Sequence, residues 1–146
     1  RATALAEPKP PKPDITSQNT PEGATNAVAY FFALYRYAFI TGDTADLAAM
    51  SEDACVFCKS TIDDATKLHQ GGGWANPWET NLNDLYYIPP GEGKEYSGIQ
   101  GTITSSASTT VRGSGETTEK SAETLSFFVA LKYADEAWTI KGVSVE

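Results

Sequence analysis

The stretch Thr20–Thr41, T-P-E-G-A-T-N-A-V-A-Y-F-F-A-L-Y-R-Y-A-F-I-T, carries apolar side chains on nearly every side of a predicted helix. Thr20 is a suitable N-cap, Pro21 suits the first helical position, and Glu22 adds an acidic residue to the first turn. Spacings of three and four residues place one group of large side chains on a single face: Val28, Phe31 or Phe32, Tyr35 and Phe39. A helix this apolar is expected to be covered by a sheet, to lie at an interface, or both.

Two further helices are predicted after this one. Thr41-Gly42-Asp43 ends the first helix, and Asp43 can cap a short helix over 44–50. Ser51-Glu52-Asp53 then leads into a third helix over 54–70, which Gly71-Gly72-Gly73 ends.

The periodicity changes after the glycines, and the rest of the chain is predicted to be strands. Residues 78–88 and 99–103 have β-compatible patterns, and Arg112–Lys120 reads as a polar hairpin tip. The cleanest alternation runs from Leu125 to Tyr133, and the last strand changes parity near Gly142, which predicts a bulge. The fold class is therefore α+β: three N-terminal helices packed on a curved antiparallel sheet of three to four strands.

Charge and proline divide the 146 residues into two parts. The net charge is −8, but residues 1–20 are slightly basic (three bases, two acids), whereas residues 21–146 carry 17 acids against eight bases. Residues 1–20 also hold four of the eight prolines and only two large apolar residues, Leu5 and Ile15, so we expect a flexible tether before a single domain over 21–146. The acidic domain makes nucleic acid and anionic membrane surfaces poor partners. No segment is apolar for long enough to span a membrane.

The chain offers few residues for catalysis or metal binding. Its single histidine, His69, would have to serve any Ser-His-Asp set or zinc site, and no phosphate-binding or dinucleotide-binding glycine motif is present. We therefore expect no catalytic set, no metal and no cofactor. The pair Cys55-Val56-Phe57-Cys58 could be a redox pair, part of a zinc site or a structural disulfide. No strand precedes it and only His69 remains as a further ligand, so the sequence favours a disulfide and an oxidising compartment.

A few charged residues could act in a site, although each has a simpler structural interpretation. His69 lies where it can interact with the end of the third helix, and Asp63 and Asp64 fit a solvated helix face. Arg36 is the one charge inside the apolar helix, and we expect it to reach solvent or an acid such as Glu123.

The order of these elements resembles the nuclear-transport-factor-2-like cone, a superfamily that includes SnoaL-like polyketide cyclases and ketosteroid isomerase. The helical half shows a closer likeness through Thr41-Gly42-Asp43-Thr44, Leu47, Ser51, Asp53, the Cys55–Cys58 pair and Gly71-Gly72-Gly73-Trp74. This pattern is similar to an uncharacterised family of actinobacterial lipoproteins. The resemblance implies export, an acylated cysteine upstream of Arg1, and a domain held at the outer face of the cell membrane or secreted.

A cone would place the first helix and the concave sheet face around a pocket. The aromatic residues expected to line it are Tyr35, Phe39, Trp74, Trp78, Tyr86 and Phe127. The competing interpretation is that these rings fill the core and a dimer face.

Three hypotheses follow. The first is an exported, envelope-anchored, non-enzymatic module that binds a small apolar ligand, a partner protein or a second copy of itself through the sheet. The second is a small SnoaL-like isomerase, cyclase or dehydratase, with Asp63, Asp64 or His69 acting beside Tyr35 or Tyr86. The third is a structural subunit of a secretion assembly, in which the domain only docks.

Overall fold

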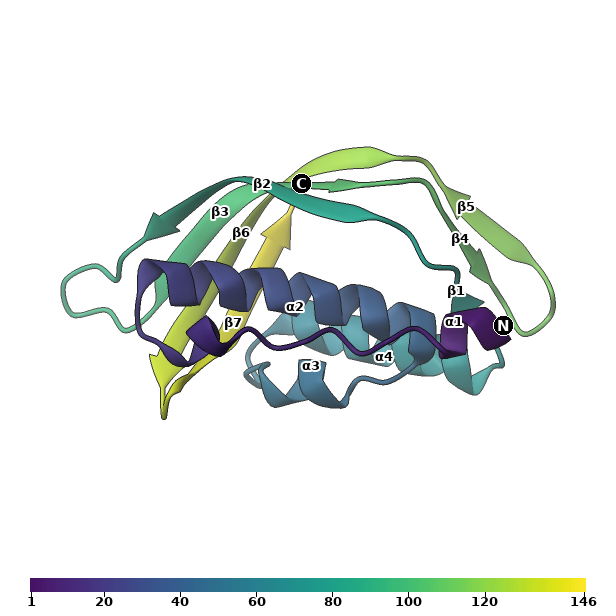
Figure 1. Cartoon of the computed structure of the whole chain (residues 1–146), viewed down its shortest axis with the longest axis horizontal. Helices are drawn as coiled ribbons and strands as arrows, with labels where there is room; N and C mark the ends of the chain where they lie inside the picture. Colours follow the sequence, from purple (N-terminus) through teal and green to yellow (C-terminus); the bar gives the residue numbers. More distant parts are fainter.

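The computed structural model describes residues 1–146 and shows an α+β fold in which helices lie under strongly curved antiparallel strands (Figure 1). The helices are α1 (Ala2–Leu5), the 3-10 turn η1 (Asp14–Ser17), α2 (Pro21–Thr41), α3 (Ala45–Ala49) and α4 (Val56–Gln70). The strands are β1 (Trp74–Ala75), β2 (Thr80–Ile88), β3 (Ser97–Ser105), β4 (Ser108–Val111), β5 (Thr117–Lys120), β6 (Glu123–Ala134) and β7 (Ala137–Val145). The α+β class is confirmed, and α1 adds a short fourth α-helix to the three expected.

Helix α2 begins and ends where its capping residues predict. The Gly23 amide donates to the Thr20 side-chain oxygen at 2.9 Å. Gly42 has a φ of 82°, in the left-handed region that glycine tolerates, and its amide donates to the Ala38 carbonyl at 2.8 Å. Both ends of α2 are therefore fixed by local sequence.

The strands form two sheets rather than one. The four-stranded sheet has the order β2-β3-β6-β7, and the three-stranded sheet has the order β1-β4-β5, with every pair antiparallel. The polar tip expected at 112–120 is the turn and second strand of the β4–β5 hairpin. The bulge near Gly142 is confirmed, because Ala130 pairs with Gly142 while Leu131 pairs with Ile140.

The core lies between α2, α4 and the inner face of the four-stranded sheet. The Phe32 ring meets the Phe127 ring edge-on, with 5.0 Å between the centroids. The fully buried large side chains come from both layers: Val28, Phe31, Leu34, Ile99, Val129, Leu131 and Ile140. Of the coverings expected for the apolar helix, a sheet, an interface or both, the structure shows a sheet.

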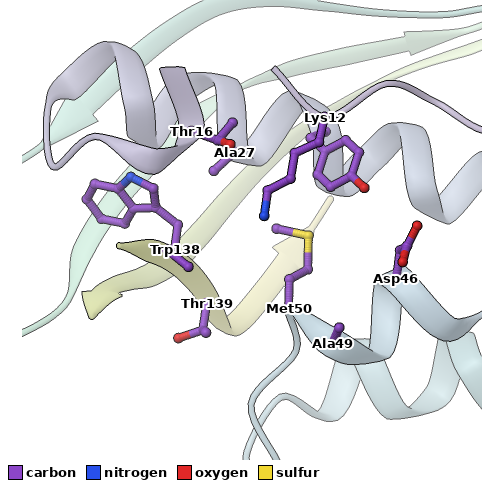
Figure 2. A pocket seen from close by; sticks show the side chains of 10 residues that line it. Lys12, Thr16, Ala27, Asp46, Ala49, Met50, Trp138 and Thr139 are labelled. Atoms are coloured by element: carbon purple, nitrogen blue, oxygen red, sulfur yellow. The ribbon is translucent and has the colours of Figure 1, made fainter. Parts of the chain in front are cut away.

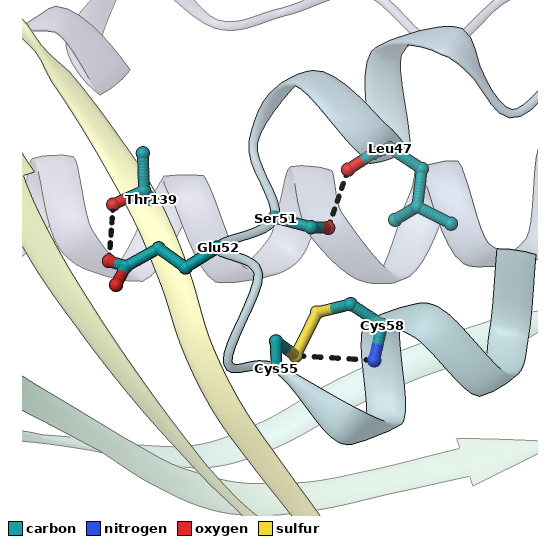
Figure 3. Close-up of a disulfide and its surroundings, with 6 residues drawn as sticks. All are labelled: Leu47, Ser51, Glu52, Cys55, Cys58 and Thr139. Atoms are coloured by element: carbon teal, nitrogen blue, oxygen red, sulfur yellow. Dashed lines mark hydrogen bonds between the residues drawn. A yellow bond between two sulfur atoms is a disulfide. The ribbon is translucent and has the colours of Figure 1, made fainter.

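The Cys55–Cys58 disulfide predicted from the sequence is confirmed, and it lies at the N-terminal end of α4 (Figure 3). Both cysteines are completely buried, so this pair has no access to a redox partner. Here Cys55 is the N-cap of α4, because the Cys58 amide donates to its sulfur at 3.2 Å.

The segment before this disulfide is attached to the edge of β7. The Glu52 amide donates to the Ile140 carbonyl at 2.8 Å, and the Glu52 carboxylate accepts hydrogen bonds from Thr139 at 2.7 Å and Tyr96 at 2.8 Å (Figure 3 shows the Thr139 bond). Burial raises the pKa of Glu52, but these two hydrogen bonds, together with nearby lysines, outweigh it and hold the pKa below its ordinary value.

Residues 1–20, for which the sequence predicts a flexible tether, lie alongside α2 in the structure (Figure 1). Ala4 and Thr16 are buried. The Trp138 indole donates to the Gln18 carbonyl at 3.0 Å, and the Tyr133 hydroxyl donates to the Ser17 carbonyl at 2.7 Å. Composition alone does not show these contacts, because they use main-chain carbonyls and small side chains.

No helix has the length and apolar character needed to cross a membrane.

Candidate functional site

The candidate site is a cavity of about 460 Å³ between the helices and the concave side of the two sheets. Helices α2 and α4 supply aromatic rings to one wall, and strands from both sheets supply the opposite wall. The apolar lining consists of Phe32, Tyr35, Phe39, Phe57, Ala75, Trp78, Ile103, Leu125 and Val145.

Polar groups gather on the strand side of this cavity. The Lys120 ammonium is 2.8 Å from the Glu123 carboxylate, and this hydrogen bond raises the pKa of Lys120. The lining also includes five residues with hydroxyl groups: Ser105, Ser106, Ser108, Thr110 and Ser121. The cavity thus combines an apolar interior with one ion pair and several groups able to hydrogen-bond a ligand.

Tyr35 is the polar residue of the aromatic wall. Its ring stacks on Phe57, with 5.8 Å between the ring centroids and 22° between the ring planes. The centroid of the Phe39 ring lies 5.1 Å from that of Tyr35. Burial raises the pKa of the Tyr35 phenol, so it stays protonated at neutral pH and can donate a hydrogen bond into the cavity.

The six aromatic residues named from the sequence do not all meet at the cavity. Tyr35, Phe39 and Trp78 line it. Phe127 is buried behind the wall, where it contacts Phe32. Trp74 packs beside the cavity residue Ala75 in a small neighbouring cluster.

Tyr86 lies elsewhere: it is 61% exposed, while the next residue, Tyr87, packs against the core. Successive residues of a strand point to opposite faces, so Tyr86 points away from the cavity.

Of the residues expected to act in an enzyme, Tyr35 lines the cavity, but the two expected carboxylates and His69 do not. Asp63 and Asp64 are exposed on α4. A ring nitrogen of His69 lies 2.8 Å from the Phe39 carbonyl, and its ring lies against Gly42, so it joins α4 to α2. Nor does any group of three or more His, Cys, Asp or Glu side chains come together in a way that could hold a metal ion.

Sequence reasoning missed the Lys120–Glu123 ion pair that borders the cavity, in which the Lys120 side chain is 64% exposed, and the partner of Arg36. Glu123 shares its strand parity with Leu125 and Phe127, so the alternation in β6 could have placed it on the inner face. Arg36 does not meet Glu123. It pairs with Glu7 at 3.1 Å and donates to the Trp78 carbonyl at 2.6 Å.

A second, smaller cavity of about 170 Å³ lies on the other side of α2 (Figure 2). The N-terminal segment covers it with Lys12 and Thr16, while Asp46 and Met50 come from α3 and its end. Lys12 extends into this cavity in Figure 2. Its size suits a few ordered waters rather than a ligand of the size that the candidate site could hold.

Comparison with known proteins shows the fold and the family. No curated protein matches the sequence. The intermembrane space region of the chloroplast protein ARC6 is 14% identical with a TM-score of 0.67, covering 88% of this chain and 97% of that one. A protein assigned as a scytalone dehydratase from Novosphingobium aromaticivorans is 11% identical, with a TM-score of 0.58. The match covers 86% of this chain and 84% of that one.

A third similar structure, the protein Aln2 from a Streptomyces species, is 12% identical, with a TM-score of 0.53. The match covers 87% of this chain and 91% of that one. The last two have nuclear-transport-factor-2-like cone folds, which confirms the fold expected from the sequence. At these identities the likeness extends to the fold alone. A family model matches residues 2–144, almost the whole chain, and the protein therefore belongs to the family of unknown function DUF6318.

Proposed function

We propose that this protein is an exported, non-enzymatic binding module whose cone cavity holds a small, largely apolar molecule. The observation that carries this proposal is the cavity itself. Its volume of about 460 Å³ falls in the range typical of small-molecule sites, roughly 300–1,000 Å³. Aromatic and aliphatic side chains form most of its lining, and its polar groups other than the Tyr35 hydroxyl lie on the strand side.

The proposed ligand has an apolar body and at least one polar group. Burial against Trp78, Phe39 and Phe57 would supply most of the binding energy, because it removes apolar surface from water. The Tyr35 hydroxyl and the Lys120–Glu123 pair would orient the polar group.

The disulfide supports export, since disulfides persist in oxidising compartments and are rare in the cytosol. The anchored location, a lipoprotein of the outer face of an actinobacterial cell membrane, is part of the proposal. It rests on the resemblance of the helical half. As a binding module, the protein would also be able to bind a partner protein on the face of its sheet instead of a small molecule in the cavity.

One observation favours a second candidate function, a small isomerase, cyclase or dehydratase. Tyr35 and Glu123 line the same cavity, so a phenol donor and a carboxylate are both available to a bound molecule. In the structure, Glu123 is engaged by Lys120 rather than free.

The test is binding of the fluorescent apolar probe 1-N-phenylnaphthylamine. We expect the wild-type protein to bind it, and Ser108→Trp, which places an indole in the cavity, to bind it much more weakly. Ser126→Trp is the matched control, because Ser126 is exposed on β6 and does not line the cavity. Absence of probe binding to the wild type would contradict the proposal.

Native mass spectrometry of the purified protein separates the two functions. A binding module carries an intact small molecule whose mass does not change on incubation, in both wild type and Glu123→Gln. An enzyme converts the molecule, and Glu123→Gln prevents the conversion.

A further inference from the structure

Three contacts dock the first nine residues, here called the N-terminal strap, against the domain, and the most exposed of them is an ion pair between Lys9 and Asp46 at 3.0 Å. Ala4 is 2% exposed and packs in a small cluster with Ile40 and Ala75. Glu7 forms an ion pair with Arg36 at 3.1 Å, and their side chains are only 18% and 23% exposed. Ion pairs this far out of solvent are screened less than surface pairs and leave an unpaired charge behind when they break.

The residues that receive the strap also form a wall of the cone cavity. Ala75 belongs both to the Ala4 cluster and to the cavity lining, and so do two partly buried side chains packed against that cluster, Phe39 and Trp78. The strap therefore lies directly behind one end of the binding site.

Arg36 connects the strap to the same wall by a second route. Its Nε donates to the Trp78 carbonyl at 2.6 Å, and its guanidinium carbon lies 5.9 Å from the centre of the Trp78 ring. The guanidinium that pairs with Glu7 thus also holds Trp78. Without Glu7, Arg36 gains by turning toward water, which removes the hydrogen bond that positions Trp78.

We propose that the N-terminal strap controls ligand binding in the cone cavity, because docking of Ala4 and Glu7 holds Trp78 and Phe39 in the geometry that closes around a ligand. Release of the strap leaves a gap behind Ala75 and frees Arg36, so the wall loosens and affinity falls. This inference rests on the proposed function, since it needs a ligand in the cavity. It would couple ligand release to any partner or mechanical load that pulls residues 1–9 from the domain.

The first test compares probe affinity in three full-length proteins. Glu7→Lys places a like charge beside Arg36, and we expect it to weaken 1-N-phenylnaphthylamine binding about fivefold, the lower end of typical allosteric coupling. Asp14→Lys makes the same change in net charge in the N-terminal segment, outside the strap and the cavity lining, and should bind like the wild type.

The second test needs no substitution, because coupling is reciprocal. We expect saturating probe to slow hydrogen exchange at the amides of Leu5, Ala6 and Glu7, which donate within the strap, and to leave the distant 89–96 loop unchanged. A wild type that binds no probe would overturn the proposed function and this inference together. A wild type that binds probe, with Glu7→Lys equally tight or strap exchange unaltered, would overturn this inference alone.

Discussion

Gly23 occupies the first turn of α2, where alanine would normally stabilise a helix by about 1 kcal/mol. At this position the structure predicts that Gly23→Ala lowers the stability of the protein. A Cβ at Gly23 would collide with the Gln18 carbonyl and approach the Ile15 carbonyl to 3.0 Å, and both are backbone atoms that cannot rotate away. Gly23→Ala must therefore move the chain around η1 away from α2.

The magnitude follows from what that chain segment holds. Moving Gln18 leaves the buried Trp138 indole without its acceptor, which costs about 2 kcal/mol, and the Tyr133–Ser17 hydrogen bond contributes about 1 kcal/mol more. After subtraction of the helix-propensity gain, the net loss is about 2 kcal/mol. For a chain of this length that corresponds to a fall in Tm of about 6 °C.

Urea unfolding followed by circular dichroism and tryptophan fluorescence measures this loss. Gly71→Ala is the control, because Gly71 has an ordinary φ of −79° and its Cβ would meet the nearest atom at 3.5 Å. We expect Gly71→Ala to change stability by no more than about 0.5 kcal/mol. If Gly23→Ala proves as stable as the wild type, the N-terminal segment is not packed on α2 as described.

Three other predictions concern the rest of the molecule. Since the pKa of Glu52 lies below its ordinary value, its contribution to stability is present above about pH 4.3 and lost as pH falls through the lowered pKa. Acid unfolding of Glu52→Gln should therefore depend less on pH, and a profile identical to the wild type would contradict the role of this carboxylate. Replacing the disulfide with Cys55→Ser and Cys58→Ser should lower the free energy of unfolding by about 2 kcal/mol, the loop-entropy value for so short a loop, and denaturant unfolding without reductant measures it. Light scattering coupled to size exclusion should find a dimer formed through the sheet face that exposes Phe128, and Phe128→Lys should return it to a monomer, whereas a monomeric wild type would refute this pairing.

Much of the fold follows from short-range sequence patterns. Thr20, Pro21 and Gly42 set the ends of α2 through capping, and the two-residue alternation predicts β6. The cysteine spacing likewise predicts the disulfide. Each of these features depends on residues a few positions apart, so the local backbone geometry is enough to predict it.

Which residues come together at the candidate site could be determined only from the tertiary structure. Strand β1 is only two residues long and exists because it pairs with β4, so no local pattern predicts it. The Glu7–Arg36 pair joins residues 29 positions apart. For Arg36 the sequence left solvent and an acid such as Glu123 open, and in the structure Glu123 pairs with Lys120 instead.

The apolar character of residues 20–41 determined that this helix would be covered, by a sheet, an interface or both. It did not determine which of its rings would fill the core and which would face a cavity. Phe31 is buried in the core, while Tyr35 and Phe39 line the cavity, although all three lie on the predicted apolar face. The curvature of the two sheets decides whether a ring packs in the core or faces the cavity, because it sets how far the opposite wall lies from each ring.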